Sequence, residues 1–148
     1  MPMDTRMRGW RGSGGRLPAA ESRLLAERTF RRGDVPAVRR FAEAFGARAG
    51  LGFARRADFV LAASEAAACA TAVGPCTARV RLWVTGTRAF CEVRANGMLR
   101  RSARGTRPGG QPGEEEALRR WVLKQLSDYV SVASGPDGVC VLLSMRVA

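Results

Sequence analysis

Residues 60–74 form an alanine-rich run that carries one carboxylate, Glu65, in an otherwise largely apolar surface. The composition suits a helix, and the Gly74-Pro75 dipeptide that follows is a strong helix terminator. A helix that is apolar almost all round is stable in water only when it is buried. We therefore expect a buried helix over residues 56–73, and the rest of the fold has to cover it.

Helical and extended patterns follow one another along the chain in a definite order. A short strand at 27–31 precedes a helix that Asp34 can cap, that has Pro36 in its first turn and that ends near Gly50. After the buried helix, two alternating runs at 78–84 and 89–93 indicate a hairpin. A third helix opens at Glu114, and a second hairpin joins 129–133 to 139–147.

Each of these elements has apolar residues at the spacing of one face. In the first helix these are Val38, Phe41, Ala42 and Phe45, and in the third helix they are Leu118, Trp121, Val122 and Leu126. In the first hairpin, the faces that we expect to point inward include Leu82, Val84, Phe90 and Val93. The periodicity leaves open which side of the hairpin is buried. The order of elements predicts an α+β two-layer sandwich, in which about three helices cover one face of a mostly antiparallel sheet.

The length of 148 residues suits one domain. Residues 1–22 are rich in Gly and Arg and lack periodicity, so we expect a disordered basic tail before a single domain at 23–148. The Gly/Pro/Arg-rich stretch 99–113 predicts a long mobile loop. We expect a cytoplasmic protein, because no stretch is long enough to span a bilayer and the N-terminus has no apolar block of signal-peptide length.

The chain contains four cysteines and no histidine. The absence of histidine excludes a Ser-His-Asp triad, a Cys-His pair and a phospho-accepting histidine. The spacing of Cys69, Cys76, Cys91 and Cys140 does not match a zinc site, so we expect no metal centre and predict buried free thiols.

The formal net charge of +12 comes almost wholly from arginine, since Lys124 is the only lysine. The arginines are spread along the chain with few aromatic residues among them to stack on bases. We favour a solvated basic surface over an acidic protein partner or a nucleic acid. Nucleic-acid binding therefore remains an alternative of lower weight.

From residue 28 to residue 147 the chain resembles the anti-sigma-factor serine/threonine kinases of bacteria. These proteins belong to the larger Bergerat-fold (GHKL) ATPases, which include the catalytic domains of histidine kinases. The Glu65 helix, the hairpin strands 80–84 and 90–94, and the ending 122–140 occur in the order of that family. The resemblance implies the histidine-kinase-like ATPase fold and directs attention to the positions that hold ATP in such proteins.

The first of these positions is on the alanine-rich helix. In the family, a Glu acts as base and an Asn four residues later ligates the magnesium that bridges the phosphates. Glu65 matches the base, but Cys69 stands where the Asn would be. Magnesium takes oxygen ligands and a thiol is soft, so Cys69 is a poor substitute. We expect Glu65 to reach solvent or to pair with an arginine, and to be catalytic only if the protein is active.

The other nucleotide positions also depart from the family. An Asp that binds adenine is replaced by Ala95, while the accompanying Gly97 is kept. The Gly-rich end of the lid has Gly109, Gly110 and Gly113 as a remnant, but the helix after it opens with three carboxylates, Glu114, Glu115 and Glu116, which repel phosphate. Before the last strand, Gly138 is followed by Val139 where the family often has Thr.

The resemblance therefore implies a degenerate member, with Glu65, Cys69, Ala95, Gly97 and Gly138 as a vestigial ATP pocket. We expect a non-catalytic, anti-sigma-like regulator that binds a sigma factor or an antagonist protein, with no cofactor. One alternative is a divergent active kinase that uses Mg-ATP, and another is a basic nucleic-acid-binding protein. A homodimer is left open.

Overall fold

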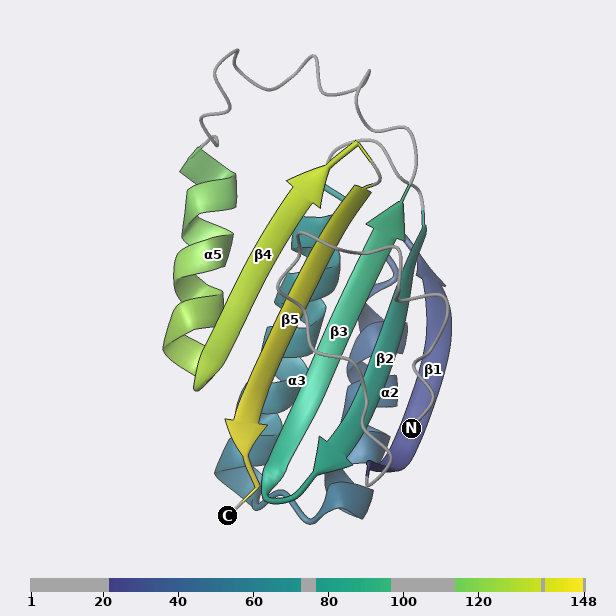
Figure 1. The fold of residues 1–148 in the computed structure, drawn as a ribbon, viewed down its shortest axis with the longest axis vertical. Helices are drawn as coiled ribbons and strands as arrows, with labels where there is room; N and C mark the ends of the chain where they lie inside the picture. Colours follow the sequence, from purple (N-terminus) through teal and green to yellow (C-terminus); the bar gives the residue numbers. More distant parts are fainter. Residues whose placement is uncertain (1–21, 73–76, 97–113, 137, 148) are drawn as a thin grey trace.

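Five antiparallel strands form one sheet, and the three helices of the described residues cover one of its faces (Figure 1). The structure, a computed structural model, describes residues 22–72, 77–96, 114–136 and 138–147. The strand order is β1-β2-β3-β5-β4, so β3 occupies the centre of the sheet. The predicted α+β two-layer sandwich is confirmed. Apart from Ser22, the predicted tail 1–22 lies outside the described residues, as does the predicted loop 99–113.

The elements follow the predicted order, with somewhat longer strands. They are β1 (Arg23–Arg31), α2 (Val35–Ala49), α3 (Phe53–Ala70), β2 (Thr77–Thr85), β3 (Arg88–Asn96), α5 (Glu114–Leu126), β4 (Tyr129–Gly135) and β5 (Gly138–Arg146). Both predicted hairpins are present, as β2–β3 and β4–β5. Among the described residues, no helix combines the length and the apolar character that a membrane-crossing helix needs.

The ends of α2 are set by local chemistry, as the sequence predicts. Asp34 Oδ1 accepts a hydrogen bond from the Ala37 backbone N–H at 3.4 Å, which satisfies one of the free donors at the helix start. Pro36 lies in the first turn. Gly50 ends the helix at a φ of +84°, a conformation that costs glycine little because it has no Cβ.

The alanine-rich helix α3 is the buried centre of the helical layer. Phe59, Ala62, Ala63 and Ala66 are all fully buried, and α3 contacts both other helices and the middle strands β3 and β5. Small side chains on this helix let its neighbours approach closely, so the alanines serve packing. The predicted burial is confirmed. The helix runs from Phe53 to Ala70, whereas the sequence predicted residues 56–73.

The prediction of which residues of the third helix are buried is partly wrong. In α5, Leu118 and Trp121 are 59% and 58% exposed, whereas Leu123 is fully buried in the main core. The reason is the position of α5, which lies beside α3 at the β4 side of the sheet (Figure 1) and is covered along only part of its surface. Helical spacing alone does not reveal how wide the buried strip is.

The hairpin β2–β3 buries both of its sides. Leu82, Val84 and Val93 pack under the helices in the main core. Phe90 is wrongly grouped with them by the sequence pattern, because it lies directly opposite Trp83 and packs with Trp83 and Leu142 in a separate cluster. Successive side chains of a strand point to opposite faces, so this second cluster lies on the face turned away from the helices.

Three of the four cysteines, Cys69, Cys91 and Cys140, are buried free thiols, as predicted. Cys76 lies outside the described residues. Burial, with Glu92 and Cys140 nearby, raises the pKa of Cys91 far above its ordinary value, so this thiol stays protonated. Among the described residues, no group of His, Cys, Asp or Glu side chains could hold a metal ion.

The docking of α5 can be tested with two leucines of the same helix. We expect Leu123→Ala to lower the free energy of unfolding by about 2–5 kcal/mol, because it removes a fully buried side chain and leaves a cavity. The exposed Leu118→Ala should change it by less than about 0.5 kcal/mol. Urea denaturation of both variants measures the difference, and equal effects would contradict the observed orientation of α5.

Candidate functional site

Glu65 and Cys69 lie one turn apart on α3 but in different surroundings. The Glu65 side chain is 28% exposed, and its Oε1 lies 3.8 Å from Nε of Arg119 on α5. Cys69 is only 5% exposed and belongs to the main hydrophobic core. The prediction that Glu65 pairs with an arginine is thus confirmed.

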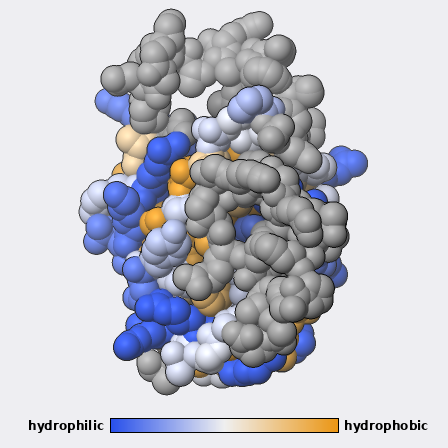
Figure 2. Space-filling view, viewed as in Figure 1, coloured by the Kyte–Doolittle hydropathy of each residue, from blue (hydrophilic) through white to orange (hydrophobic). Residues whose placement is uncertain are grey.

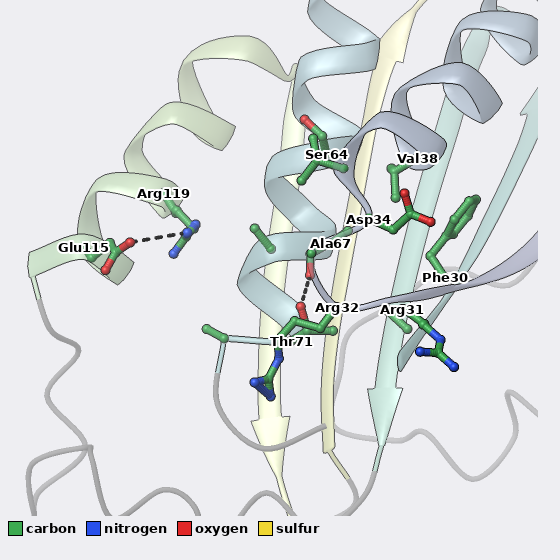
Figure 3. Close-up of a pocket in the computed structure, with 15 residues that line it drawn as sticks. Phe30, Arg31, Arg32, Asp34, Val38, Ser64, Ala67, Thr71, Glu115 and Arg119 are labelled. Atoms are coloured by element: carbon green, nitrogen blue, oxygen red, sulfur yellow. Dashed lines mark hydrogen bonds and ion pairs between the residues drawn. The ribbon is translucent and has the colours of Figure 1, made fainter. Parts of the chain in front are cut away.

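Arg119 joins α5 to α3 through carboxylates on both helices. Besides Glu65, it contacts Glu115 one turn earlier on α5, with 3.4 Å between the Arg119 Nη2 and Glu115 Oε2 atoms (Figure 3). Glu114 and Glu115 are both exposed at the start of this helix, where negative charge complements the helix dipole. Glu65 is therefore paired with a cation of the protein itself.

Ala95 and Gly138 meet at the ends of two neighbouring strands. Ala95 pairs with Val139, and Asn96 pairs with Gly138, in the β3–β5 ladder. Ala95 is 1% exposed and lies in the same core cluster as Cys69. Gly138 has a φ of +127°, a conformation that L side chains rarely adopt, at the start of β5 after the β4–β5 turn.

The structure thus places two of the predicted site residues in the main core. Cys69 and Ala95 share one buried cluster, and Gly138 lies at the register position next to the Ala95–Val139 pair. Glu65 instead reaches the α5 side of α3 through its ion pair. Gly97 and the lid residues Gly109, Gly110 and Gly113 lie outside the described residues.

A pocket of about 360 Å³ opens on another side of α3 (Figure 3). None of Glu65, Cys69, Ala95 and Gly138 lines it. Its wall on this side is formed by Ser64, Ala67 and Ala68 of α3 and by Thr71 and Ala72 directly after the helix. This stripe is centred about 100° around the helix axis from Glu65, since each residue turns the helix by that amount.

The pocket has an apolar wall and a rim of mixed charge. Phe30 and Val38 contribute to the wall, while Arg31, Arg32, Asp34, Glu115 and Arg119 supply charges from the β1–α2 turn and from α5. The sequence analysis missed this site, because its residues come from three distant segments. The predicted helix cap at Asp34 marks the β1–α2 turn in the sequence, but no local sequence pattern indicates that a cavity forms beside this turn.

The hydroxyl groups that line the pocket are already used within α3. Ser64 Oγ donates to the Leu61 carbonyl at 2.9 Å, and Thr71 Oγ1 donates to the Ala67 carbonyl at 2.8 Å. Such back-bonding to the preceding turn is common for hydroxyl residues inside helices.

Comparison with known proteins identifies a family for most of the chain. The family model of the histidine kinase-like ATPase domain matches residues 29–145. That range begins near the end of β1 and ends in β5, so it includes β2, β3, β4 and all three described helices completely. No curated protein sequence matches the chain.

The ion pair between α3 and α5 should be worth little stability. Both side chains are 28% exposed, so water screens the attraction, and we expect a coupling energy below about 1 kcal/mol. A double-mutant cycle with Glu65→Gln and Arg119→Gln in urea measures it. A second cycle, with Glu115→Gln and Arg119→Gln, measures the contact within α5 separately. A coupling of several kcal/mol between Glu65 and Arg119 would contradict the observed exposure of the two side chains.

Proposed function

This chain belongs to the histidine kinase-like ATPase domain family, and from that premise we propose that it is a regulator that acts by binding a protein. It keeps the fold of ATPase- and kinase-like regulatory domains while its nucleotide positions have lost their chemistry. The partner we propose is a sigma factor or the antagonist of one, as in the anti-sigma-factor kinases that the sequence resembles. The protein would act without transferring phosphate.

The burial of Cys69 is the observation that carries this proposal. A magnesium ion bound with ATP needs oxygen ligands. At position 69 the chain offers a thiol that is 5% exposed and packed in the hydrophobic core. A thiol is a soft ligand, and this one is surrounded by apolar side chains, so the residues of this face do not fit Mg-ATP.

The adenine position supports the same conclusion. Ala95 is 1% exposed and has only a methyl group to offer. A site that selects a base by hydrogen bonding needs an acceptor for the amino group, and an unpaired amino group buried against a methyl loses its hydrogen bonds to water. Adenine would therefore gain no selective contact from Ala95.

The phosphate end is occupied by protein charges. The Glu65 carboxylate faces Arg119, and Glu114 and Glu115 are exposed at the start of α5. A helix start ordinarily attracts phosphate through its dipole. Here two carboxylates oppose a triphosphate at that position, which again favours a regulator that has no ATP switch.

Protein binding is also supported by the surface of α5. Leu118 and Trp121 are more than half exposed, and Tyr129, just after the helix, is 45% exposed. Large apolar side chains that gather on a surface commonly mark protein interaction sites, and Trp and Tyr are frequent in the centres of such interfaces. A domain that keeps this fold without the nucleotide chemistry, and that exposes such residues, is suited to binding another protein.

Thermal denaturation with nucleotide tests the loss of ATP binding. We expect millimolar Mg-ATP to leave the melting temperature unchanged. A ligand at a hundred times its Kd would add about 2.7 kcal/mol, which raises the melting temperature by several degrees in a domain of this size. ADP and magnesium alone serve as controls, and a saturable upward shift with Mg-ATP would refute this part of the proposal.

Titration with purified partners tests the regulatory role. The sigma factors and antagonist proteins of the source organism are added one at a time, and we expect one of them to bind with an affinity that Mg-ATP does not change. Glu65→Ala should leave that affinity unaltered. Transfer of labelled phosphate to the partner, lost in Glu65→Ala, would instead establish an active kinase.

A further inference from the structure

The pocket beside the β1–α2 turn has no role in the proposed regulatory function. Its volume of about 360 Å³ lies within the range of small-molecule sites, roughly 300–1,000 Å³. It opens on the helical side of the sheet, between the β1–α2 turn, α3 and α5 (Figure 3). Well-packed protein interiors leave few spaces larger than a water molecule. A space of this size therefore has room for a ligand.

The inner wall of the pocket is apolar and continuous with the main hydrophobic core. Phe30, Val38 and Ala78 line the pocket and are all buried in that core. On α3, Ala67 and Ala68 are half-buried and contribute only methyl side chains. Such a wall favours a ligand with an apolar body, because binding removes apolar surface of both molecules from water.

The two hydroxyl groups in the wall cannot recognise an anionic group. Ser64 and Thr71 both donate to carbonyl groups of α3, at 2.9 and 2.8 Å. Arg39 Nε lies 3.5 Å from Ser64 Oγ, so this hydroxyl accepts as well. A hydroxyl has one proton to donate, and both protons are already used. A charged group on the ligand must therefore be recognised at the rim.

Arginines outnumber carboxylates at the rim of the pocket. Arg31, Arg32 and Arg119 line it, together with Asp34 and Glu115. Asp34 accepts the hydrogen bond that caps α2, and Glu115 is paired with Arg119. Both carboxylates are therefore engaged within the protein, and the two arginines of the β1–α2 turn give this side of the rim a positive charge.

The amount of charge favours a ligand with a single negative group. The three arginines and two carboxylates of the lining leave one excess positive charge, and counting the charged neighbours Arg39 and Glu65 leaves this excess unchanged. Among the described residues, no side-chain cluster could hold a metal ion to neutralise more. A triphosphate would bring several negative charges close to Asp34 and Glu115. One carboxylate matches the excess, and a guanidinium group binds it through two parallel hydrogen bonds.

We propose that the pocket binds a small amphipathic anion, namely a carboxylic acid with an aliphatic or aromatic body. The body lies against Phe30, Val38 and the alanines of α3, and the carboxylate lies at Arg31 and Arg32. This goes beyond the proposed regulatory function and does not depend on it. A ligand in the pocket contacts the β1–α2 turn, α3 and α5 together, so its binding stabilises the packing of α5 against α3.

A fluorescent probe of the same chemistry tests the site in the full-length protein. The probe 1-anilinonaphthalene-8-sulfonate combines an aromatic body with one anionic group, and its emission rises when it leaves water. We expect one molecule to bind per chain and octanoate to displace it. Octanol should need at least about tenfold higher concentrations, because it lacks the charge that a guanidinium group binds. Octylammonium has the same chain with a positive charge and should displace the probe least.

Variants locate the probe, because apolar side chains are exposed elsewhere as well. Leu118 and Trp121 are more than half exposed, and Figure 2 shows hydrophobic residues between hydrophilic ones on the opposite side of the molecule. Ala67→Leu fills the pocket and should abolish binding that octanoate can displace. Ala57→Leu is the matched control, at an exposed position of α3 that does not line the pocket. Ala68→Leu carries the same test if Ala67→Leu does not fold.

A second pair of variants tests the charge at the rim. Arg31→Gln with Arg32→Gln should raise the concentration of octanoate needed for displacement by about tenfold and leave that of octanol unchanged. Arg40→Gln with Arg48→Gln removes the same charge from exposed positions of α2 that do not line the pocket. This control should change neither concentration.

Retained binding in the filled pocket overturns the proposal. If the leucine variants at Ala67 and Ala68 are folded by circular dichroism and bind the probe with unchanged affinity, the ligand site lies elsewhere. Equal displacement by octanoate, octanol and octylammonium overturns the proposal too, as does displacement by Mg-ATP at lower concentrations than octanoate. Loss of binding in a folded leucine variant, together with displacement that depends on the negative charge, supports it.

Discussion

The burial of α3 is the constraint on which the rest of the structure depends. Its alanines present a narrow, apolar surface, so α2, α5 and the middle strands can all approach one helix. A larger residue at Ala62, Ala63 or Ala66 would push these neighbours apart, because each is fully buried. Close approach of α5 also brings Arg119 within reach of Glu65, and so the character of the candidate site follows from the packing.

This packing also determines what the side chains at the proposed nucleotide positions contact. The histidine kinase-like ATPase fold is retained over residues 29–145, but the side chains at the proposed nucleotide positions belong to the core or to internal ion pairs. Cys69 and Ala95 add apolar contact where a catalytic site needs ligands and acceptors. These contacts support the proposed role of the protein as a regulator that binds another protein.

The middle strands β2, β3 and β5 add a second constraint, because they are buried on both faces. β5 is buried almost without interruption from Cys140 to Met145, a pattern more typical of strands covered on both sides. The helices account for only one of these faces (Figure 1). Leu82 and Phe90 thus look equivalent in the sequence, although they pack in different clusters on opposite sides.

The sequence by itself determined the order of elements, the cap at Asp34, the end of α2 at Gly50, the two hairpins and the burial of α3, because each depends on local chemistry or on periodicity. It also named Glu65, Cys69 and Ala95 as the positions to examine. Only the tertiary structure decided that Arg119 is the partner of Glu65, that Leu123 is buried in place of Leu118 and Trp121, and that a pocket forms beside Asp34. These features join segments far apart in the chain, and their contacts depend on how helices and strands pack, which no short stretch of sequence specifies.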